Sequence, residues 1–327
     1  MAYILIYVDD IILITFTHAL HKSIMSLVTS EFVMKELGQQ SYFLGIDVSR
    51  PPSGIFLSQS TYASEIIECA DMASYKPSAT PIDTKQKLST SSGTPYEDTS
   101  LYRSLAGALQ YPAFTRPDIS YVIQQVCLHM HAPRIEDIFA LKRILRYVQG
   151  TLHFGLHLSP SPITKFISYT DADCGGCPDT RRSTSGSFVF LDDSLISWSS
   201  KRQPILSLVL VMKPNIEVLL MLSLSRVGFT IFFWSSIFTF FRPLWCIVTM
   251  LVPFISPVIL CNISVPNIFE MDIHFVREKV ARGQARVLQV PSRHQITDIF
   301  TKMLPRILFD DFRTSLSVRE PPASTAG

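Results

Sequence analysis

Apolar, β-branched runs alternate with amphipathic stretches along this 327-residue chain, a pattern typical of a mixed α/β protein. Two apolar runs near the N-terminus predict two strands joined in a hairpin. Apolar residues at helical spacing follow, then two strands joined across Arg50 to Ser53, and a helix capped by Thr61. The elements predicted in the first 70 residues span 3–8, 11–14, 19–33, 41–49, 54–59 and 61–69.

The rest of the chain divides at a linker and at several prolines. Lys76 to Asp98 is rich in Pro, Ser and Thr, which predicts an extended linker. From Ser100 to Gly150 the spacing predicts helical pieces, broken near Pro112 and Pro117 and again at Pro133. Further strands are predicted at residues 166–171, 187–191, 196–198 and 287–290.

Asp9 and Asp10 lie between the first two apolar runs, at the bend of the predicted hairpin. Adjacent carboxylates on a rigid hairpin suit Mg²⁺, a hard cation that takes oxygen ligands and shares them with substrate phosphates. Two such ions can hold the attacking and leaving oxygens of a phosphoryl transfer. A polar turn between two core strands is the simpler interpretation of a bare Asp-Asp pair.

Composition and charge argue against a signal peptide and a zinc site, but they do not indicate a function. Lys+Arg 29 against Asp+Glu 27 gives a net charge of +2, so any nucleic-acid surface must be local. The N-terminal apolar stretch carries acids and no basic residues, so it is not expected to be a signal peptide. The cysteines form no regular framework, and Cys174 and Cys177 lack a second ligand pair nearby, so a zinc site is not expected. The cysteines are residues 69, 127, 174, 177, 246 and 261.

Two other features have possible functional meaning. The predicted helix from Ile135 to Val148 places Lys142, Arg143 and Arg146 on one side, where they could hold phosphates. A solvated helix face explains the same charges at least as well. Asp171 ends a predicted strand, where a carboxylate can point into a cleft, although a lone Asp there is usually a turn former.

Motifs along the whole chain resemble the polyprotein of copia-type retrotransposons. The first is Tyr-Val-Asp-Asp at 7–10, which resembles the metal motif of the reverse-transcriptase palm. The others occur in the family's order and cover most of residues 1–204 and 270–318. They are LGI (44–46), YRSLAGALQY (102–111), TRPDI (115–119), KRILRY (142–147), YTDAD (169–173), RRSTSG (181–186), SWSSKRQP (197–204), DIHFVRE (272–278) and DIFTK (298–302).

The resemblance implies an α+β or α/β protein: a partial palm and thumb-like connection followed by a disrupted ribonuclease H-like domain. By resemblance, Asp9 and Asp10 would hold polymerase Mg²⁺, and Asp171 and Asp298 would be the first and last metal-binding acids of the ribonuclease H. RNA and DNA are the implied partners, and the cytoplasm or nucleus the implied location. The expected divisions are palm remnant (1–75), linker and helical connection (76–160), first ribonuclease H part (165–204), apolar segment (205–269), second ribonuclease H part (270–318) and tail (319–327).

Two departures from the family predict incomplete catalytic sites. The family's palm has a third metal-binding Asp on an earlier strand, which would precede Met1, so the Asp9–Asp10 site is expected to be incomplete. Residues 205–269 should carry the second and third ribonuclease H acids, yet this apolar segment has four charged residues. They are Lys213, Glu217, Arg226 and Arg242. We therefore expect an inactive remnant, or a nucleic-acid-binding module without catalysis.

A change of reading frame explains the apolar segment. Suitable codons for 207–218, 246–250 and 264–269, read from the third base, give Ser-Arg-Ser-Ser-Asp-Glu-Ala-Glu-Tyr-Arg-Gly, Tyr-Cys-Asp-Asn and Arg-Thr-Lys-His-Ile. One offset thus restores three family motifs in their order. Residues 205–269 are then out-of-frame translation, bounded by compensating insertions and deletions or caused by an error in the assignment of the gene's coding sequence. The sheet that begins near 165 is expected to lack its usual partners. The strand at 287–290 would still allow Asp171 and Asp298 to approach.

Membrane association through residues 227–261 is the remaining alternative. Pro243 to Cys261 is an uncharged apolar run, close to the length of about 20 residues that a spanning helix needs. Hydrophobicity alone can drive insertion, whatever its origin. Prolines at 243, 253 and 257, together with the restored motifs, argue against an evolved span.

Overall fold

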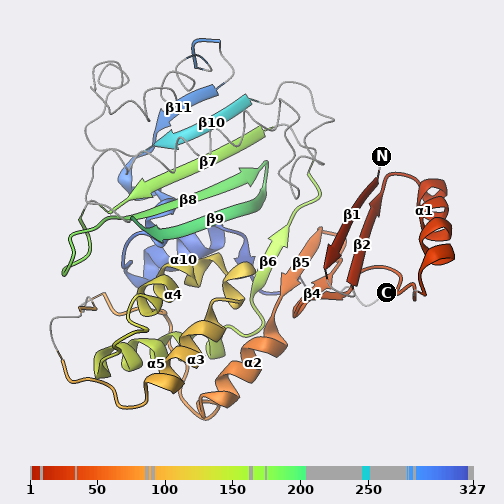
Figure 1. Cartoon of the computed structure of the whole chain (residues 1–327). Helices are drawn as coiled ribbons and strands as arrows, with labels where there is room; N and C mark the ends of the chain where they lie inside the picture. The colour runs from red at the N-terminus through yellow and green to blue at the C-terminus, as the bar shows by residue number, and fades with distance from the viewer. Residues whose placement is uncertain are drawn as a thin grey trace.

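The computed structural model describes three sheets and the helices that pack beside them (Figure 1). The described residues are 2–7, 10–33, 35–84, 88–89, 93–161, 165–173, 175–203, 245–250, 278, 280–282 and 285–322.

The predicted N-terminal hairpin is present. Strands β1 (Ala2–Tyr7) and β2 (Asp10–Thr15) pair antiparallel, with Tyr7 opposite Asp10. Helix α1 (His18–Glu31) follows, and the Thr17 side chain caps it by accepting from the backbone N–H of Leu20 at 3.3 Å. No residue of α1 is buried, so this unit at one side of the molecule contributes little to the core (Figure 1).

A second sheet joins distant parts of the chain in the order β12-β6-β5-β4-β3. One strand was expected at 41–49, but the chain forms two, because Leu44 and Gly45 both have positive φ and turn it back. The neighbours are antiparallel, and the C-terminal β12 pairs with β6. The strands are β3 (Tyr42–Phe43), β4 (Ile46–Ser49), β5 (Ile55–Ser58), β6 (Gly155–Leu158) and β12 (Val318–Arg319).

The helices are broken at prolines, as the sequence predicted. They form a layer beside the sheet that contains residues 165–172, 184–191 and 194–202, which has the longer strands and is called the larger sheet (Figure 1). Thr61 is not the cap of α2: that helix begins one residue earlier, and Gln59 at the cap position makes no side-chain capping bond. The elements are α2 (Ser60–Cys69), α3 (Thr99–Leu109), η1 (Pro112–Phe114), η2 (Pro117–Ile119), α4 (Ser120–Cys127) and α5 (Ile135–Gly150).

The third sheet has the order β11-β10-β7-β8-β9, with β7 at its centre. The pairs β7–β8 and β8–β9 are antiparallel, whereas β10 runs parallel to both β7 and β11. The strands are β7 (Lys165–Ala172), β8 (Thr184–Leu191), β9 (Ser194–Arg202), β10 (Trp245–Met250) and β11 (Ala285–Gln289).

The expectation that this sheet lacks partners from 205–269 is wrong at β10. Val248 lies opposite Ser168 of β7 on one side and Val287 of β11 on the other. The physical reason is composition: a parallel strand inside a sheet needs a short run rich in β-branched residues, which Ile247, Val248 and Thr249 supply. The rest of that segment lies outside the described residues.

The C-terminal part returns to the helical layer. After η4 (Ser292–His294), the 3₁₀-helix η5 (Ile296–Phe300) contains Asp298, and α10 (Arg306–Ser315) follows. Phe300 and Leu316 share one buried core with Leu141 of α5 and Phe188 of β8. In the described part of the chain, no helix has the length and apolar character needed to cross a membrane.

Candidate functional site

Strand β7 carries Asp171 to one end of the larger sheet. Asp171 is the last residue but one of β7, and it pairs with Gly186 of β8. Its side chain is nearly enclosed, with 3% of its surface exposed. The predicted position of Asp171 on a central strand is therefore confirmed.

The 3₁₀-helix η5 brings the second acid to the same place. A turn after η5 forms because the backbone N–H groups of Thr301 and Lys302 both donate to the Asp298 carbonyl, at 3.1 and 2.8 Å. Gly186 permits the close approach of this turn to β8: a Cβ there would lie 2.6 Å from the Cβ of Phe300. The Gln295 amide also donates to the carbonyl of Thr170 at 3.2 Å, which ties η5 to β7.

The ammonium group of Lys302 bridges the two acids. Its Nζ lies 2.7 Å from Oδ1 of Asp298 and 3.2 Å from Oδ2 of Asp171. The Thr301 hydroxyl donates to the same Oδ2 of Asp171 at 2.7 Å. The structure therefore brings Asp171 and Asp298 together, as expected, through a lysine to which the sequence analysis gave no role.

Burial and charge act in opposite directions on this group. The pKa of Asp298 is raised to about 6, first because the carboxyl is buried; Lys302 lowers it, and the nearby Asp171 raises it further. Burial lowers the pKa of Lys302, but the two carboxylates outweigh burial and the net pKa is raised. The lysine is therefore held in its charged form between the acids.

This group does not fit the two-metal centre that the resemblance implies. A two-metal site needs several carboxylates that converge on the ions. Among the described residues, no group of three or more His, Cys, Asp or Glu side chains could hold a metal ion. Asp171 and Asp298 are two acids, and an ammonium already lies between them.

The other predicted acids lie largely outside the described part of the chain. Asp9 is outside it, and of Asp10 only the backbone is described, at the start of β2 opposite Tyr7. Their role as metal ligands stays a prediction. Cys174 is also outside, while Cys177 is buried.

The basic residues of α5 mostly hold the preceding linker. Arg143 donates from Nε to the Thr80 carbonyl at 3.3 Å, and its Nη1 lies 3.6 Å from Oδ2 of Asp83. Arg146 donates from Nε to the Lys76 carbonyl at 2.6 Å. Among the described residues, Lys142 makes no hydrogen bond or ion pair and remains available to a ligand.

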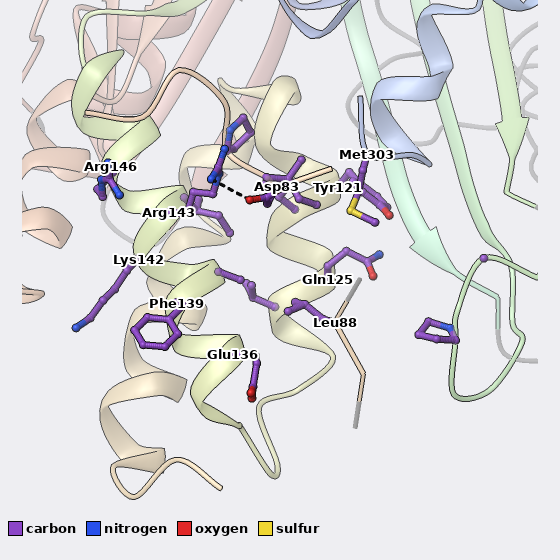
Figure 2. Close-up of a pocket in the computed structure, with 18 of the residues that line it drawn as sticks. Asp83, Leu88, Tyr121, Gln125, Glu136, Phe139, Lys142, Arg143, Arg146 and Met303 are labelled. Atoms are coloured by element: carbon purple, nitrogen blue, oxygen red, sulfur yellow. Dashed lines mark ion pairs between the residues drawn. The ribbon is translucent and has the colours of Figure 1, made fainter. Parts of the chain in front are cut away.

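A cavity of about 720 Å³ lies beside these residues (Figure 2). One wall comes from α5 and contains Lys142 and Arg143, and the opposite wall includes Tyr121 and Met303. In Figure 2 the Lys142 side chain extends away from the side chains of that opposite wall. The cavity is thus lined by residues of both the helical layer and the larger sheet, and both acidic and basic side chains line it. The charged members are Asp83, Glu136, Lys142, Arg143, Arg146, Asp173 and Arg202.

The chain is similar to several known proteins. Residues 2–84 match the family model described as reverse transcriptase (RNA-dependent DNA polymerase). An uncharacterized mitochondrial protein of Arabidopsis thaliana is 46% identical over 205 residues, which are 63% of this chain and 85% of that protein. The chain matches more than two thirds of this relative.

Two transposon proteins are longer relatives. The Retrovirus-related Pol polyprotein from transposon RE2 of Arabidopsis thaliana is 34% identical over 99% of this chain, and that from transposon TNT 1-94 of Nicotiana tabacum is 28% identical over 94%. The chain spans only 22% and 24% of their respective lengths. A foamy viral protease-reverse transcriptase, solved with double-stranded DNA, aligns with 88% of this chain and 46% of its own at TM-score 0.45 and 14% identity.

Proposed function

The chain belongs to the copia-type retrotransposon Pol polyprotein family, and we propose that it is a catalytically inactive remnant of that polyprotein. In this proposal, residues 1–75 are the end of a reverse-transcriptase palm and residues 76–160 a helical connection. Residues 165–204 and 270–318 belong to a ribonuclease H-like domain. Asp9 and Asp10 are proposed as acids of the polymerase part.

The topology of the larger sheet supports the ribonuclease H-like assignment. Antiparallel β7, β8 and β9 are followed by parallel β10 and β11, with Asp171 near the end of the central strand. In the alternative reading frame, the acid of Tyr-Cys-Asp-Asn falls across the codons of Val248 and Thr249. These residues pair with Ser168 and Tyr169 of β7, just before Asp171. The restored acid would thus lie on the strand beside the first acid.

The single observation that carries the proposed inactivity is that the described residues bring just two acids, Asp171 and Asp298, to this site, with Lys302 between them. Hydrolysis by two metals requires carboxylates that converge on both ions. Here Asp171 accepts a hydrogen bond from Thr301 and forms an ion pair with Lys302, and Asp298 accepts a hydrogen bond from Lys302. The protein's own donors therefore occupy the two acids that family resemblance assigns to this site.

An assay on an RNA–DNA hybrid tests this proposal. The purified full chain, given Mg²⁺ and a labelled hybrid, should release no fragments of the RNA strand. Asp171→Asn serves as the matched variant, because it keeps the size of the side chain and removes its charge. RNA cleavage by the wild-type chain that disappears in Asp171→Asn would overturn the proposal.

The frame-shift hypothesis has a separate test, the nucleotide sequence across codons 204–270. We expect one shifted frame there to encode the three restored motifs without a stop codon. A sequence whose shifted frame lacks these motifs would show that residues 205–269 have another origin, whatever the hybrid assay gives.

A nucleic-acid-binding function without catalysis is the second candidate, and the availability of Lys142 favours it. Lys142 lies on α5 beside Arg143 and Arg146, whose guanidinium groups donate to carbonyl oxygens of the linker. A surface that binds phosphates releases counterions, so its affinity should fall steeply as salt rises.

Binding of a labelled RNA–DNA hybrid across a salt series tests this candidate. Lys142→Ala should weaken binding and lower the slope of log affinity against log salt by about 1. The matched control is Lys22→Ala, since Lys22 is exposed on α1 in a different part of the chain. Affinity that is independent of salt, or equal effects of the two variants, would contradict a phosphate-binding role for α5.

A further inference from the structure

Lys302 occupies the place between Asp171 and Asp298 where a shared cation would lie. Its Nζ is within 3.2 Å of an oxygen of each acid. The exposed fractions of the three side chains show which of them faces solvent. Those of Asp171 and Asp298 are 3% and 14% exposed, whereas that of Lys302 is 41% exposed. The lysine therefore covers the acids from the solvent side.

The local backbone makes this geometry difficult to avoid. Lys302 follows Asp298 by four positions, and the turn after η5 folds its side chain back over that acid. On the other side, Thr301 donates to Asp171 and thereby fixes the rotamer of that carboxylate. Both acids are then oriented toward a single point, which the ammonium fills.

The ammonium of Lys302 neutralises one of the two negative charges of the cluster. Two neighbouring carboxylates away from water repel one another strongly, and a cation that contacts both relieves the repulsion. A divalent ion would have to displace the ammonium, or share the acids with a positive charge at close range. Either route weakens the binding of the ion.

We propose that Lys302 is the resident cation of the Asp171–Asp298 pair and excludes divalent metal ions from it. This inference deepens the proposed inactivity of the same site, on which it rests, by naming the group that closes the site. It predicts that removal of the ammonium converts the pair into a divalent-cation site. Metal binding, rather than cleavage, tests it, so its failure can be distinguished from failure of the proposed function.

Titration of the full chain with Mn²⁺, followed by electron paramagnetic resonance of the free ion, measures this binding. Lys302→Met removes the charge and keeps most of the stem, and it should bind one Mn²⁺ at least about tenfold more tightly than the wild type. Lys302→Arg keeps the charge and should behave as the wild type does. The double variant Lys302→Met/Asp171→Asn should lose the gain.

Two further variants keep the result interpretable. Arg306→Met removes a cation from an exposed pair with Asp310 in α10 and should leave Mn²⁺ binding unchanged. Lys302→Gln replaces Lys302→Met if the latter fails to fold, as judged by near-ultraviolet circular dichroism. The wild type should bind Mn²⁺ no better than Asp171→Asn. Binding by the wild type that Asp171→Asn abolishes, or no gain in folded Lys302→Met and Lys302→Gln, would overturn the proposal.

Discussion

The guanidinium group of Arg116 contacts the carboxylate of Asp118 at two points, with Nε to Oδ1 at 2.9 Å and Nη2 to Oδ2 at 2.8 Å. Both side chains are almost entirely buried. The hydroxyl of Tyr147 donates to Oδ2 of Asp118 at 2.6 Å, and Nη1 of Arg116 donates to the Thr151 carbonyl at 2.9 Å. This ion pair therefore fixes η2 against the C-terminal end of α5.

The same network includes the C-terminal helix. Nη1 of Arg313 donates to the Tyr147 hydroxyl at 3.2 Å, and the rings of Tyr147 and Phe309 meet edge to face with centroids 5.6 Å apart. The guanidinium of Arg313 also lies over the ring of Phe154, 4.9 Å from its centroid. Helix α10 is thus part of the helical layer.

Loss of the buried carboxylate should strongly destabilise the fold. Asp118→Ala leaves Arg116 buried without its partner, which should lower the free energy of unfolding by about 3–5 kcal/mol. Urea denaturation followed by circular dichroism measures this change. Arg306→Ala, which breaks an exposed pair with Asp310, is the control and should change stability by less than about 1 kcal/mol. Equal losses in the two variants would show that burial of the pair is unimportant.

Acid should remove the stabilisation that Asp118 supplies. Burial alone would raise the pKa of Asp118, but the charge of Arg116 and the hydrogen bonds from Arg116 and Tyr147 outweigh it, and the net pKa is lowered. The contribution is then complete above the unfolded-state pKa of about 3.9 and is lost as the pH falls through the folded-state value. The free energy of unfolding should therefore fall less steeply in Asp118→Asn than in the wild type as the pH is lowered from about 6 to about 2. Parallel profiles would refute this assignment.

The close approach of η5 to β8 should not tolerate a side chain at Gly186. A Cβ at this position would lie 2.6 Å from the Cβ of Phe300 and 2.8 Å from Cγ2 of Thr301. Gly186→Ala should therefore cost about 1–3 kcal/mol, measured by thermal unfolding. Gly107 of α3 is the matched control, since an added Cβ meets nothing within 4 Å there. Gly107→Ala should stabilise the protein by about 0.5–1 kcal/mol, and a Gly186→Ala result of the same sign would contradict the packing argument.

The N-terminal hairpin should promote self-association. Ile4, Ile6 and Ile11 lie on one face of the hairpin and are 45%, 66% and 40% exposed. Exposed apolar strands with free edges tend to pair with other chains. Ile6→Lys should shift the sedimentation profile toward monomer, whereas Ser23→Lys, which adds the same charge on exposed α1, should not. Equal shifts in both variants would indicate a general effect of charge.

Local chemistry in the sequence predicted most of the elements. Short runs of apolar and β-branched residues predicted the β1–β2 hairpin and β7, and the prolines near 112, 117 and 133 predicted the breaks between helices. Such signals work because side-chain period and the geometry of proline act within a few residues. The turn at Leu44 and Gly45 escaped the sequence analysis because a continuous apolar run can equally be one strand or two.

Contacts between distant segments decided the rest. The pairing of β10 with β7 contradicted the expectation that residues 205–269 give the larger sheet no partner strand. β-Branched residues can form a parallel strand even where they come from an out-of-frame segment. The basic face of α5 was visible in the sequence, but only the path of the linker shows that Arg143 and Arg146 hold carbonyl oxygens. The motif with Asp298 and Lys302 was likewise visible. The ion pairs of Lys302 also require Asp171, which the larger sheet brings close to this motif from another part of the chain. Electrostatic interaction depends on distance in space, and the spacing of residues in the sequence does not determine that distance.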